Sequence, residues 1–353
     1  MDDIGDLVTS FRSEFGKESA IGFADSFIPE SRAGFLPTNC FALDYVIGRG
    51  GTPLGRLIEI FGPFSSGKST VAASIMASFQ QNDGFAILFD TEHSYEPEWM
   101  IKQGVDPSKV FKPEVVTLQE AFIQIRFLCR KIREDELTSP CVIVFDSISA
   151  LPVQEEMDGD FDNKQIGIHA RYISSGFRVI TGLMWDSRVA LIVVSQQKHD
   201  PMNPYKIAKL GGETVNFHAA TQIKVNRVSK HDDHIVTRLE ATKNKIAPPF
   251  RQATCKILFS GGIDDSPAYA EVGASCGIFG KSAAGWFEFE GVKYRASNLP
   301  EEARKAIRLA TTFGVSHGSP EVANEEGLRQ VADVKSEDTT PEGPFKTIAL
   351  PSV

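Results

Sequence analysis

The sequence lacks a long apolar run. No stretch approaches the roughly 18 apolar residues that a bilayer-spanning helix needs, and the acidic start, Met1-Asp2-Asp3, is no signal peptide. Cysteine is also scarce, with five residues scattered along the chain and no close pair of the kind used in zinc or redox sites. We therefore predict a cytoplasmic protein with no membrane partner, in which most cysteines are core thiols.

A surplus of positive charge is absent as well. The 37 Lys and Arg residues are outnumbered by 46 Asp and Glu residues, which gives a formal net charge of −9. This balance excludes a protein coated in basic residues, but it leaves room for a local basic groove that binds nucleic acid. What is present, 353 residues with 42% hydrophobic and 24% charged content, is typical of a soluble globular chain with two or three structural units.

A phosphate-binding loop is the most informative segment that is present. The apolar run 57–61 precedes it, and Val71, Ile75 and Phe79 follow it at helical spacing. Glycines let the backbone turn sharply, so that N–H groups and a helix N-terminus face the phosphates of a nucleoside triphosphate. Lys68 would reach the outer phosphates, and Ser69 would offer a hydroxyl to Mg²⁺. A glycine-serine turn that fits by chance is the alternative. The predicted nucleotide-binding residues here are Gly62, Pro63, Phe64, Ser65, Ser66, Gly67, Lys68, Ser69 and Thr70.

Alternating patterns predict the fold class. Between residues 57 and 196, apolar strand runs alternate with helical periodicity, as a parallel sheet with crossover helices requires. After residue 212, three shorter runs show period-two alternation, which indicates antiparallel strands at one edge of the sheet. We therefore predict an α/β fold with a mostly parallel sheet, flanking helices and an antiparallel extension. The predicted strands cover 85–90, 141–146, 190–195, 221–228, 235–242 and 253–259, and apolar stripes mark helices over 118–132 and 166–184.

Polar residues that end apolar strands are candidate ligands, because ligands bind beyond the carboxyl ends of strands in open α/β sheets. Asp146 is placed to hold Mg²⁺ through its water shell, although a capping acid would look the same. Glu92 is a candidate acceptor for a proton from the water that attacks the γ-phosphate, and a surface cap is an equal alternative. Gln196 is a candidate γ-phosphate sensor, although the residue is weak evidence by itself.

A basic segment follows Gln196 directly. Residues 197–210 hold three lysines against a single acid, Asp200, with two prolines and no regular period, which predicts a mobile loop. Its position next to a phosphate sensor favours nucleotide-gated binding of a polyanion over a merely solvated loop. An Asp- and Gly-rich loop ends at Lys164, ahead of a helix with two arginines. The candidate polyanion-binding residues are Lys164, Arg171, Arg178, Lys198, Lys206, Lys209, Gly211 and Gly212.

Several motifs together resemble the RecA recombinases. The resemblance runs from about residue 15 to residue 291, and its motifs occur in the family's order. The matching runs are LGRLIEIFGPFSSGKST at 54–70, DTEH at 90–93, VFDS at 144–147, IGIHAR at 166–171 and KNKIAPPF at 243–250.

The resemblance implies a RecA-like P-loop ATPase core that forms a homo-oligomeric filament on single-stranded DNA, with ATP and Mg²⁺ held between protomers. It implies homologous pairing and strand exchange with double-stranded DNA, with single-strand-binding and loading proteins as further partners. Lys68, Glu92 and Gln196 fall on catalytic positions, and Lys243 with Lys245 falls on a pair inserted from the adjacent subunit. Trp99 falls on an aromatic that stacks on adenine. The loops 157–165 and 197–210 match the DNA-binding loops, and Arg171 and Arg178 match phosphate contacts.

Four units are implied along the chain: an N-terminal protomer-contact element (1–36), the ATPase core (37–270), a reduced C-terminal domain (271–318) with a helix near 300–313, and an acidic tail (319–353) that is predicted to be disordered and to restrain DNA binding. Phe64 stands where bacterial relatives carry an acid, and the second DNA loop is slightly shorter. The runs DGD at 158–160 and GGIDD at 261–265 resemble the bacteriophage branch of the family.

Two other functional classes fit parts of this pattern. A helicase-like motor would share the phosphate loop, Glu92 and Asp146, but the N-terminal element and the Lys243 and Lys245 pair favour the filament. A regulatory ATP-binding module fits the overall acidity, and the basic segment 197–210 speaks against it.

Overall fold

The computed structural model describes residues 9–10, 13–14, 34–159, 167–200, 203–209, 214–280 and 285–312, with the backbone alone for 198–200 and 203–209. Most of the predicted N-terminal element, the whole predicted tail, and Lys164, Gly211 and Gly212 lie outside these residues. Within the described part of the chain, no helix combines the length and the apolar character needed to cross a bilayer.

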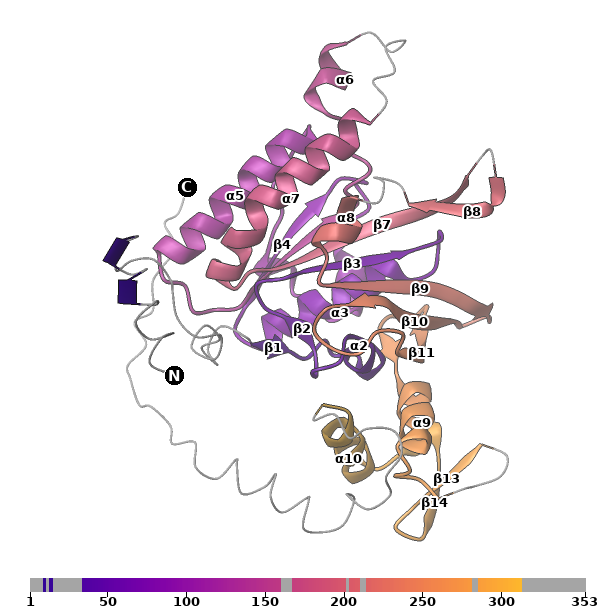
Figure 1. Ribbon diagram of the computed structural model, residues 1–353. Coiled ribbons are helices and arrows are strands. Elements are labelled where there is room, and N and C mark those ends of the chain that lie inside the picture. The colour runs from indigo at the N-terminus through magenta and orange to yellow at the C-terminus, as the bar shows by residue number, and fades with distance from the viewer. Residues whose placement is uncertain are drawn as a thin grey trace.

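A ten-stranded mixed sheet forms the centre of the molecule (Figure 1). Its order is β12-β11-β10-β9-β3-β7-β6-β4-β5, with β8 paired to β7. Strands β9, β3, β7, β6, β4 and β5 run parallel, and β9 to β12 pair antiparallel. The predicted α/β fold is confirmed. The strands are β3 (Leu57–Gly62), β4 (Phe85–Asp90), β5 (Val110–Phe111), β6 (Cys141–Asp146), β7 (Ala190–Asp200), β8 (Asn203–Lys209), β9 (Thr221–Lys230), β10 (His234–Asn244), β11 (Gln252–Leu258) and β12 (Ile263–Asp264).

Helices cover both faces of the sheet because its central strands are apolar on both sides; every residue of β3 and β6 is buried. On one face, α5 (Leu118–Glu134) lies beside α7 (Ile168–Ser187), as Figure 1 shows. Phe122 of α5 meets Phe177 of α7 edge to face, with ring centroids 5.3 Å apart. A capping box of Thr117 and Glu120 begins α5. Most of each predicted apolar stripe is buried, and residue 166, where the second stripe was predicted to begin, lies outside the described residues; the buried members are Leu118, Ala121, Phe122, Ile125 and Ile132 on α5 and Ile173, Phe177, Ile180 and Met184 on α7.

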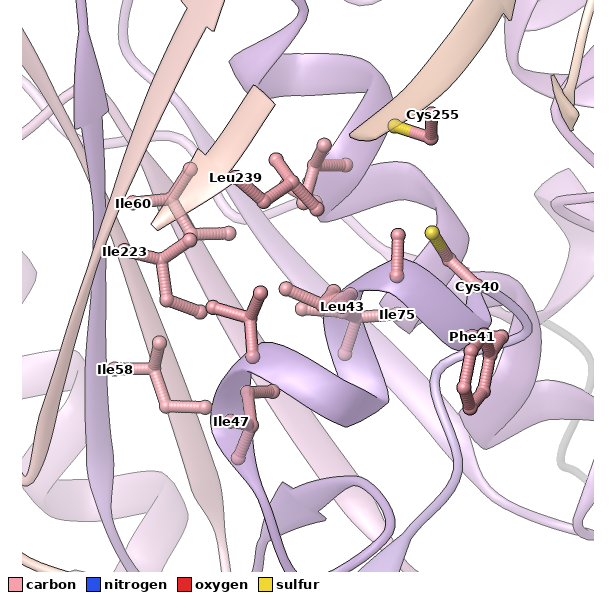
Figure 2. Packing of buried hydrophobic residues seen from close by; sticks show 14 of the residues in the cluster. Cys40, Phe41, Leu43, Ile47, Ile58, Ile60, Ile75, Ile223, Leu239 and Cys255 are labelled. Carbon is pink, nitrogen blue, oxygen red and sulfur yellow. The ribbon is translucent and has the colours of Figure 1, made fainter. Parts of the chain in front are cut away.

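On the other face, α2 (Phe41–Ile47) and α3 (Lys68–Gln81) pack on the strands. In Figure 2, Ile58, Ile60, Ile223 and Leu239 project from the sheet toward Leu43, Ile47 and Ile75 of these two helices. All five cysteines are described and are free thiols; four are buried and Cys276 is half-buried, so most are core thiols as predicted. Short elements complete this part: β1 (Phe35–Leu36), β2 (Thr52–Pro53), α4 (Pro97–Lys102), η2 (Pro107–Lys109), α6 (Gln154–Asp158) and α8 (Thr214–His218).

One prediction was wrong. Residues 197–210 were expected to form a loop without regular structure, but β7 continues to Asp200 and pairs antiparallel with β8, from Gln197 opposite Lys209 to Asp200 opposite Asn203. The two prolines of this segment had argued against a strand. An edge strand tolerates proline, because its outward N–H positions need no ladder partner, and β8 pairs only with β7 among the described strands.

The C-terminal unit is fastened to the core. It comprises α9 (Ser266–Ser275), the β13 (Trp286–Phe289) and β14 (Val292–Arg295) hairpin, η3 (Ala296–Asn298) and α10 (Glu301–Thr312), which confirms the helix predicted near 300–313. The predicted domain boundary at residue 270 falls inside α9. Phe41 of α2 stacks on Tyr269 of α9, with ring centroids 4.0 Å apart, and Arg308 of α10 lies over both rings. Apolar residues of α9 and α10 belong to the same buried cluster as α2.

A buried carboxylate also links the two parts. Asp44 accepts hydrogen bonds from the Thr38 backbone N–H (2.8 Å) and hydroxyl (2.7 Å), and it pairs with Arg308 at 3.2 Å. Burial raises the pKa of Asp44 to about 6, and the Thr38 and Arg308 contacts only partly offset that effect.

We expect Arg308→Ala to destabilise the fold in a pH-dependent way. Below pH 6 the Asp44 carboxyl is mostly protonated and has little charge to lose, whereas above pH 6 the variant leaves a buried carboxylate without its cation. Because Arg308 is partly exposed, the expected loss is about 1–3 kcal/mol at pH 8 and below about 1 kcal/mol at pH 5. Urea unfolding at both pH values measures it, with Lys305→Ala on the exposed side of α10 as the control. Equal losses at the two pH values would contradict the pairing.

Candidate nucleotide site and nucleic-acid interface

The phosphate loop lies between the end of β3 and the start of α3, supported by the antiparallel strands. A Cβ at Gly62 would lie 2.1 Å from the Val225 carbonyl oxygen, and one at Gly67, whose φ is 98°, would lie 2.0 Å from Cδ1 of Ile257. Only glycine fits these two positions. The Thr237 hydroxyl of β10 donates to the Ser66 carbonyl at 3.1 Å. The antiparallel strands therefore support one side of the loop, and the N–H groups of the first turn of α3 are available to an anion on its other side.

The predicted cation and metal-binding groups meet at this loop. Nζ of Lys68 donates to the Pro63 carbonyl at 2.9 Å, and the Ser69 hydroxyl donates to Oδ2 of Asp146 at 2.7 Å. A serine hydroxyl beside a carboxylate is an oxygen donor set that suits Mg²⁺, which is held in such sites by one or two protein oxygens and by the phosphates. No cage of three or more His, Cys, Asp or Glu side chains occurs in the described residues. Ser69 and Asp146 thus fit a magnesium ion that arrives with nucleotide.

Burial controls the electrostatics of the loop. It raises the pKa of Asp146 to about 6, with a further rise from Glu92, and the Ser69 hydrogen bond and the Lys68 charge act in the opposite direction. Burial also lowers the pKa of Lys68, against the raising influence of Asp146 and then Glu92. Burial thus makes the charged forms of Asp146 and Lys68 costly, and a bound phosphate and cation would stabilise them.

Glu92 and Gln196 meet at the same edge of the sheet. The Gln196 amide donates to Oε1 of Glu92 at 2.5 Å. The parallel register explains this contact. Gln196 is opposite Gly62 and Asp90 is opposite Asp146, so the ends of these strands, and Glu92 just after Asp90, lie at one edge of the sheet. The structure therefore brings together the predicted catalytic carboxylate, phosphate sensor, metal-binding acid and phosphate loop.

No role for Asp90 was predicted from the sequence, and this residue stabilises the turn after β4 that carries Glu92. Asp90 is buried, accepts from the N–H groups of Ser94 (2.9 Å) and Tyr95 (3.1 Å), and pairs with Lys112 at 2.9 Å. Burial opposes its ionisation, but the Lys112 and backbone hydrogen bonds outweigh burial and lower the pKa of Asp90. Its position at the end of an apolar strand was the sequence signal that could have identified it as a residue of the site. Trp99 lies half-buried on α4, just beyond this turn, and its adenine contact stays a prediction.

Lys243 and Lys245 lie at the opposite end of the sheet from the phosphate loop. Lys243 is opposite Gln222, near the start of β9, and β9 runs parallel to β3 with Thr221 opposite Ile58. Gln222 is opposite Glu59, so Lys243 is level with Glu59, and the strand rises roughly 10 Å from there to Gly62. Nζ of Lys243 donates to the Asn216 carbonyl, and Nζ of Lys245 donates to the Phe217 carbonyl at 3.3 Å. Within one protomer, the two lysines do not reach the site.

The candidate DNA-binding cations lie on two elements. Arg171 and Arg178 are exposed and seven residues apart on α7, hence on one side of that helix. Lys198, Lys206 and Lys209 lie on the β7 and β8 hairpin, which projects beyond the sheet in Figure 1. Burial lowers the pKa of His218, and the charges of Arg178, Lys245 and Lys243 lower it further, so these three cations lie near His218 at the end of α8.

A glycine-rich anion cradle, flanked by a hydroxyl and a carboxylate suited to Mg²⁺ and by a hydrogen-bonded Glu92 and Gln196, defines a P-loop ATPase. Comparison with known proteins then narrows the class. The family described as RecA N-terminal domain matches residues 3–264, so the chain belongs to the RecA family, as the sequence motifs had predicted.

Curated relatives agree with that assignment. Protein RecA from Frankia casuarinae is 33% identical over 319 residues, which cover 88% of this chain and 87% of the relative. Protein RecA from Amycolatopsis mediterranei is 33% identical over 321 residues, with 88% and 86% covered. Protein RecA from Mycolicibacterium smegmatis is 31% identical over 334 residues, with 93% and 92% covered. The chain is thus a DNA-dependent ATPase of recombination and repair. Its affiliation with the bacteriophage branch stays a prediction.

Proposed function

We propose that this chain assembles on single-stranded DNA as a filament, with ATP and Mg²⁺ between adjacent protomers, and that the filament pairs its strand with a homologous duplex and exchanges strands in the cytoplasm. The observation that carries the proposal is the continuity of β7. One strand, Ala190–Asp200, holds Gln196 against Glu92 at the nucleotide site and runs on into the basic hairpin. A change at the γ-phosphate is therefore transmitted directly to the element that would bind DNA.

Each residue of the site then has a role. The loop N–H groups and Lys68 bind the phosphates, while Ser69 and Asp146 hold the cation. Mg²⁺ supplies neutralisation of the charge on the outer phosphates. Glu92 accepts a proton from the attacking water, and Gln196 donates to the γ-phosphate in place of its bond to Glu92. Trp99 stacks on the adenine of the bound ATP.

The two lysines act across the interface. Because Lys243 and Lys245 lie at the far end of the sheet from their own phosphate loop, they act on the nucleotide of the next protomer. Two ammonium groups there stabilise the charge that develops during phosphoryl transfer, much as an arginine finger does. Hydrolysis therefore requires assembly. DNA is held by Arg171, Arg178 and the lysines of the hairpin, mainly through the backbone and with little sequence preference. Loading and single-strand-binding proteins would act on this filament.

Hydrolysis measured with and without single-stranded DNA tests the function. We expect single-stranded DNA to stimulate hydrolysis by roughly tenfold or more, because DNA-dependent assembly completes the site. Electron microscopy of the same samples should show filaments, and labelled strands should exchange. Hydrolysis that is indifferent to DNA would overturn the proposal and favour a motor or a regulatory module on the same core.

We expect Arg171→Ala to weaken binding to single-stranded DNA equally for all sequences. Losing one phosphate contact should lower the slope of log affinity against log salt by about 0.7. Fluorescence anisotropy with several oligonucleotides over a salt series measures both effects. Lys293→Ala, an exposed position on β14, is the matched control and should bind like the wild type. A sequence-dependent loss would instead indicate base contacts.

A further inference from the structure

Helix α8 holds both of the lysines that the proposed function assigns to the neighbouring site. The carbonyls of Asn216 and Phe217 accept from Lys243 and Lys245, respectively. The last carbonyls of a helix have no partner within the helix, and they form its negative end. Ammonium groups are therefore stabilised there. Lysines held in this way lie over their own protomer.

A buried side chain fixes the position of α8. Gln222, only 6% exposed on β9, donates from Nε2 to Oδ1 of Asn216 at 2.5 Å and also to the carboxylate of Glu59. Glu59 is fully buried in β3, three residues before Gly62. Gln222 and Glu59 are buried and Asn216 is half-buried, so breaking these hydrogen bonds is costly mainly because Gln222 and Glu59 would lose a partner without gaining water. The Gln222 amide thus ties α8 to the strand that ends in the phosphate loop.

Several positive charges lie near the helix that Gln222 holds in place. Arg178, Lys243 and Lys245 bring three positive charges close to His218 at the end of the helix. These like charges repel one another, which favours movement of the lysines away from α8. The hydrogen bonds to the Asn216 and Phe217 carbonyls oppose that movement as long as α8 stays in place. The helix also begins only five positions after the end of β8, so the basic hairpin and α8 are close neighbours along the chain.

We propose that Asn216 and Gln222 are positioning residues that hold Lys243 and Lys245 against α8 in the free protomer, and that nucleic acid on the β7 and β8 hairpin releases them by moving α8. This inference rests on the proposed function, in which both lysines act in trans. It assigns to α8 the role of keeping hydrolysis low in protein that has not bound DNA.

Asn216→Ala tests the proposal, with Asn216→Asp as the matched control. Alanine removes the acceptor for Gln222 without disfavouring the helix, whereas aspartate keeps an oxygen at the same place. In free protomer without nucleotide or DNA, trace acetylation followed by mass spectrometry reports the reactivity of the Lys243 and Lys245 amines. Lys293, exposed on β14, is the internal reference. We expect labelling to rise about 2- to 10-fold in Asn216→Ala, the factor that one net hydrogen bond provides, and not to rise in Asn216→Asp, whose carboxylate also favours the charged, unreactive form of the amines.

Hydrolysis supplies a second measurement that a merely structural role would not reproduce. At protein concentrations high enough for protomers to associate without DNA, the DNA-free rate of Asn216→Ala should rise about 2- to 10-fold while the DNA-saturated rate stays within about twofold, so the stimulation ratio falls. Gln222→Met, which removes the donor, should show the same pattern. Unchanged labelling, or a parallel loss of both rates, would overturn the inference. A wild type that lacks DNA stimulation would instead overturn the proposed function, and the labelling would still decide whether α8 holds the lysines.

Discussion

Lys68→Ala will reduce ATP hydrolysis by roughly 100- to 1,000-fold, the usual cost of removing one preorganised charge from a phosphoryl-transfer site. Lys68 is the cation of the phosphate loop; its Nζ is already held over the loop by the Pro63 carbonyl at 2.9 Å. Burial lowers the pKa of Lys68, so the charge is poorly solvated until phosphate arrives. The side chain therefore contributes most when the outer phosphates are bound and their charge is changing.

Steady-state hydrolysis with saturating single-stranded DNA measures this effect, and a fluorescent nucleotide analogue separates binding from turnover. Lys131→Ala is the control, because Lys131 is exposed and pairs with Asp135 one turn away, at 2.7 Å. A variant at Lys68 that retained more than about a tenth of the wild-type rate would place the reacting phosphates somewhere other than this loop.

Lys243→Ala and Glu92→Gln will each lose most activity alone, and a mixture of the two will recover part of it. Each variant lacks a different half of a shared site, so we expect losses of at least about 100-fold. In a random mixture, an interface is intact when Glu92 comes from one variant and Lys243 from the other. Recovery should approach roughly a quarter of the wild-type rate, since each half comes from the right variant half of the time in a head-to-tail assembly.

The matched control is a mixture of Lys243→Ala with Lys245→Ala. Both positions lie on the same side of the interface, so every interface lacks one lysine and no rescue is expected. Co-sedimentation with DNA establishes that the variants assemble together. If the first mixture assembles and stays inactive, the two lysines do not complete the site of a neighbour.

The sequence was sufficient to predict most of the fold, because β3 and β6 are buried on both faces and read as continuous apolar runs. Strand ends then identified Asp146, Glu92 and Gln196, since the carboxyl ends of parallel strands meet at one edge. The structure places all three around the phosphate loop, and only the parallel register had to be assumed.

Features that depend on distant pairings could not be predicted. Glu59 and Gln222 are 163 residues apart and meet only because β9 lies beside β3. The distance of Lys243 from the phosphate loop follows from antiparallel register, which period-two alternation does not reveal. The β7 and β8 hairpin was missed because its prolines locally favour a loop and the ladder to β7 overrides that preference.

Strand β10 touches two nucleotide sites in the proposed filament. Near one end, Thr237 supports the phosphate loop of its own protomer through the Ser66 carbonyl; at the other end, Lys243 serves the next protomer. About 20 Å of extended chain joins these points, and pairing with both β9 and β11 makes it a stiff strut. Nucleotide binding at one site would then affect the site of the next protomer in one direction along the filament. Successive ATP turnovers should therefore proceed along the filament with a defined polarity.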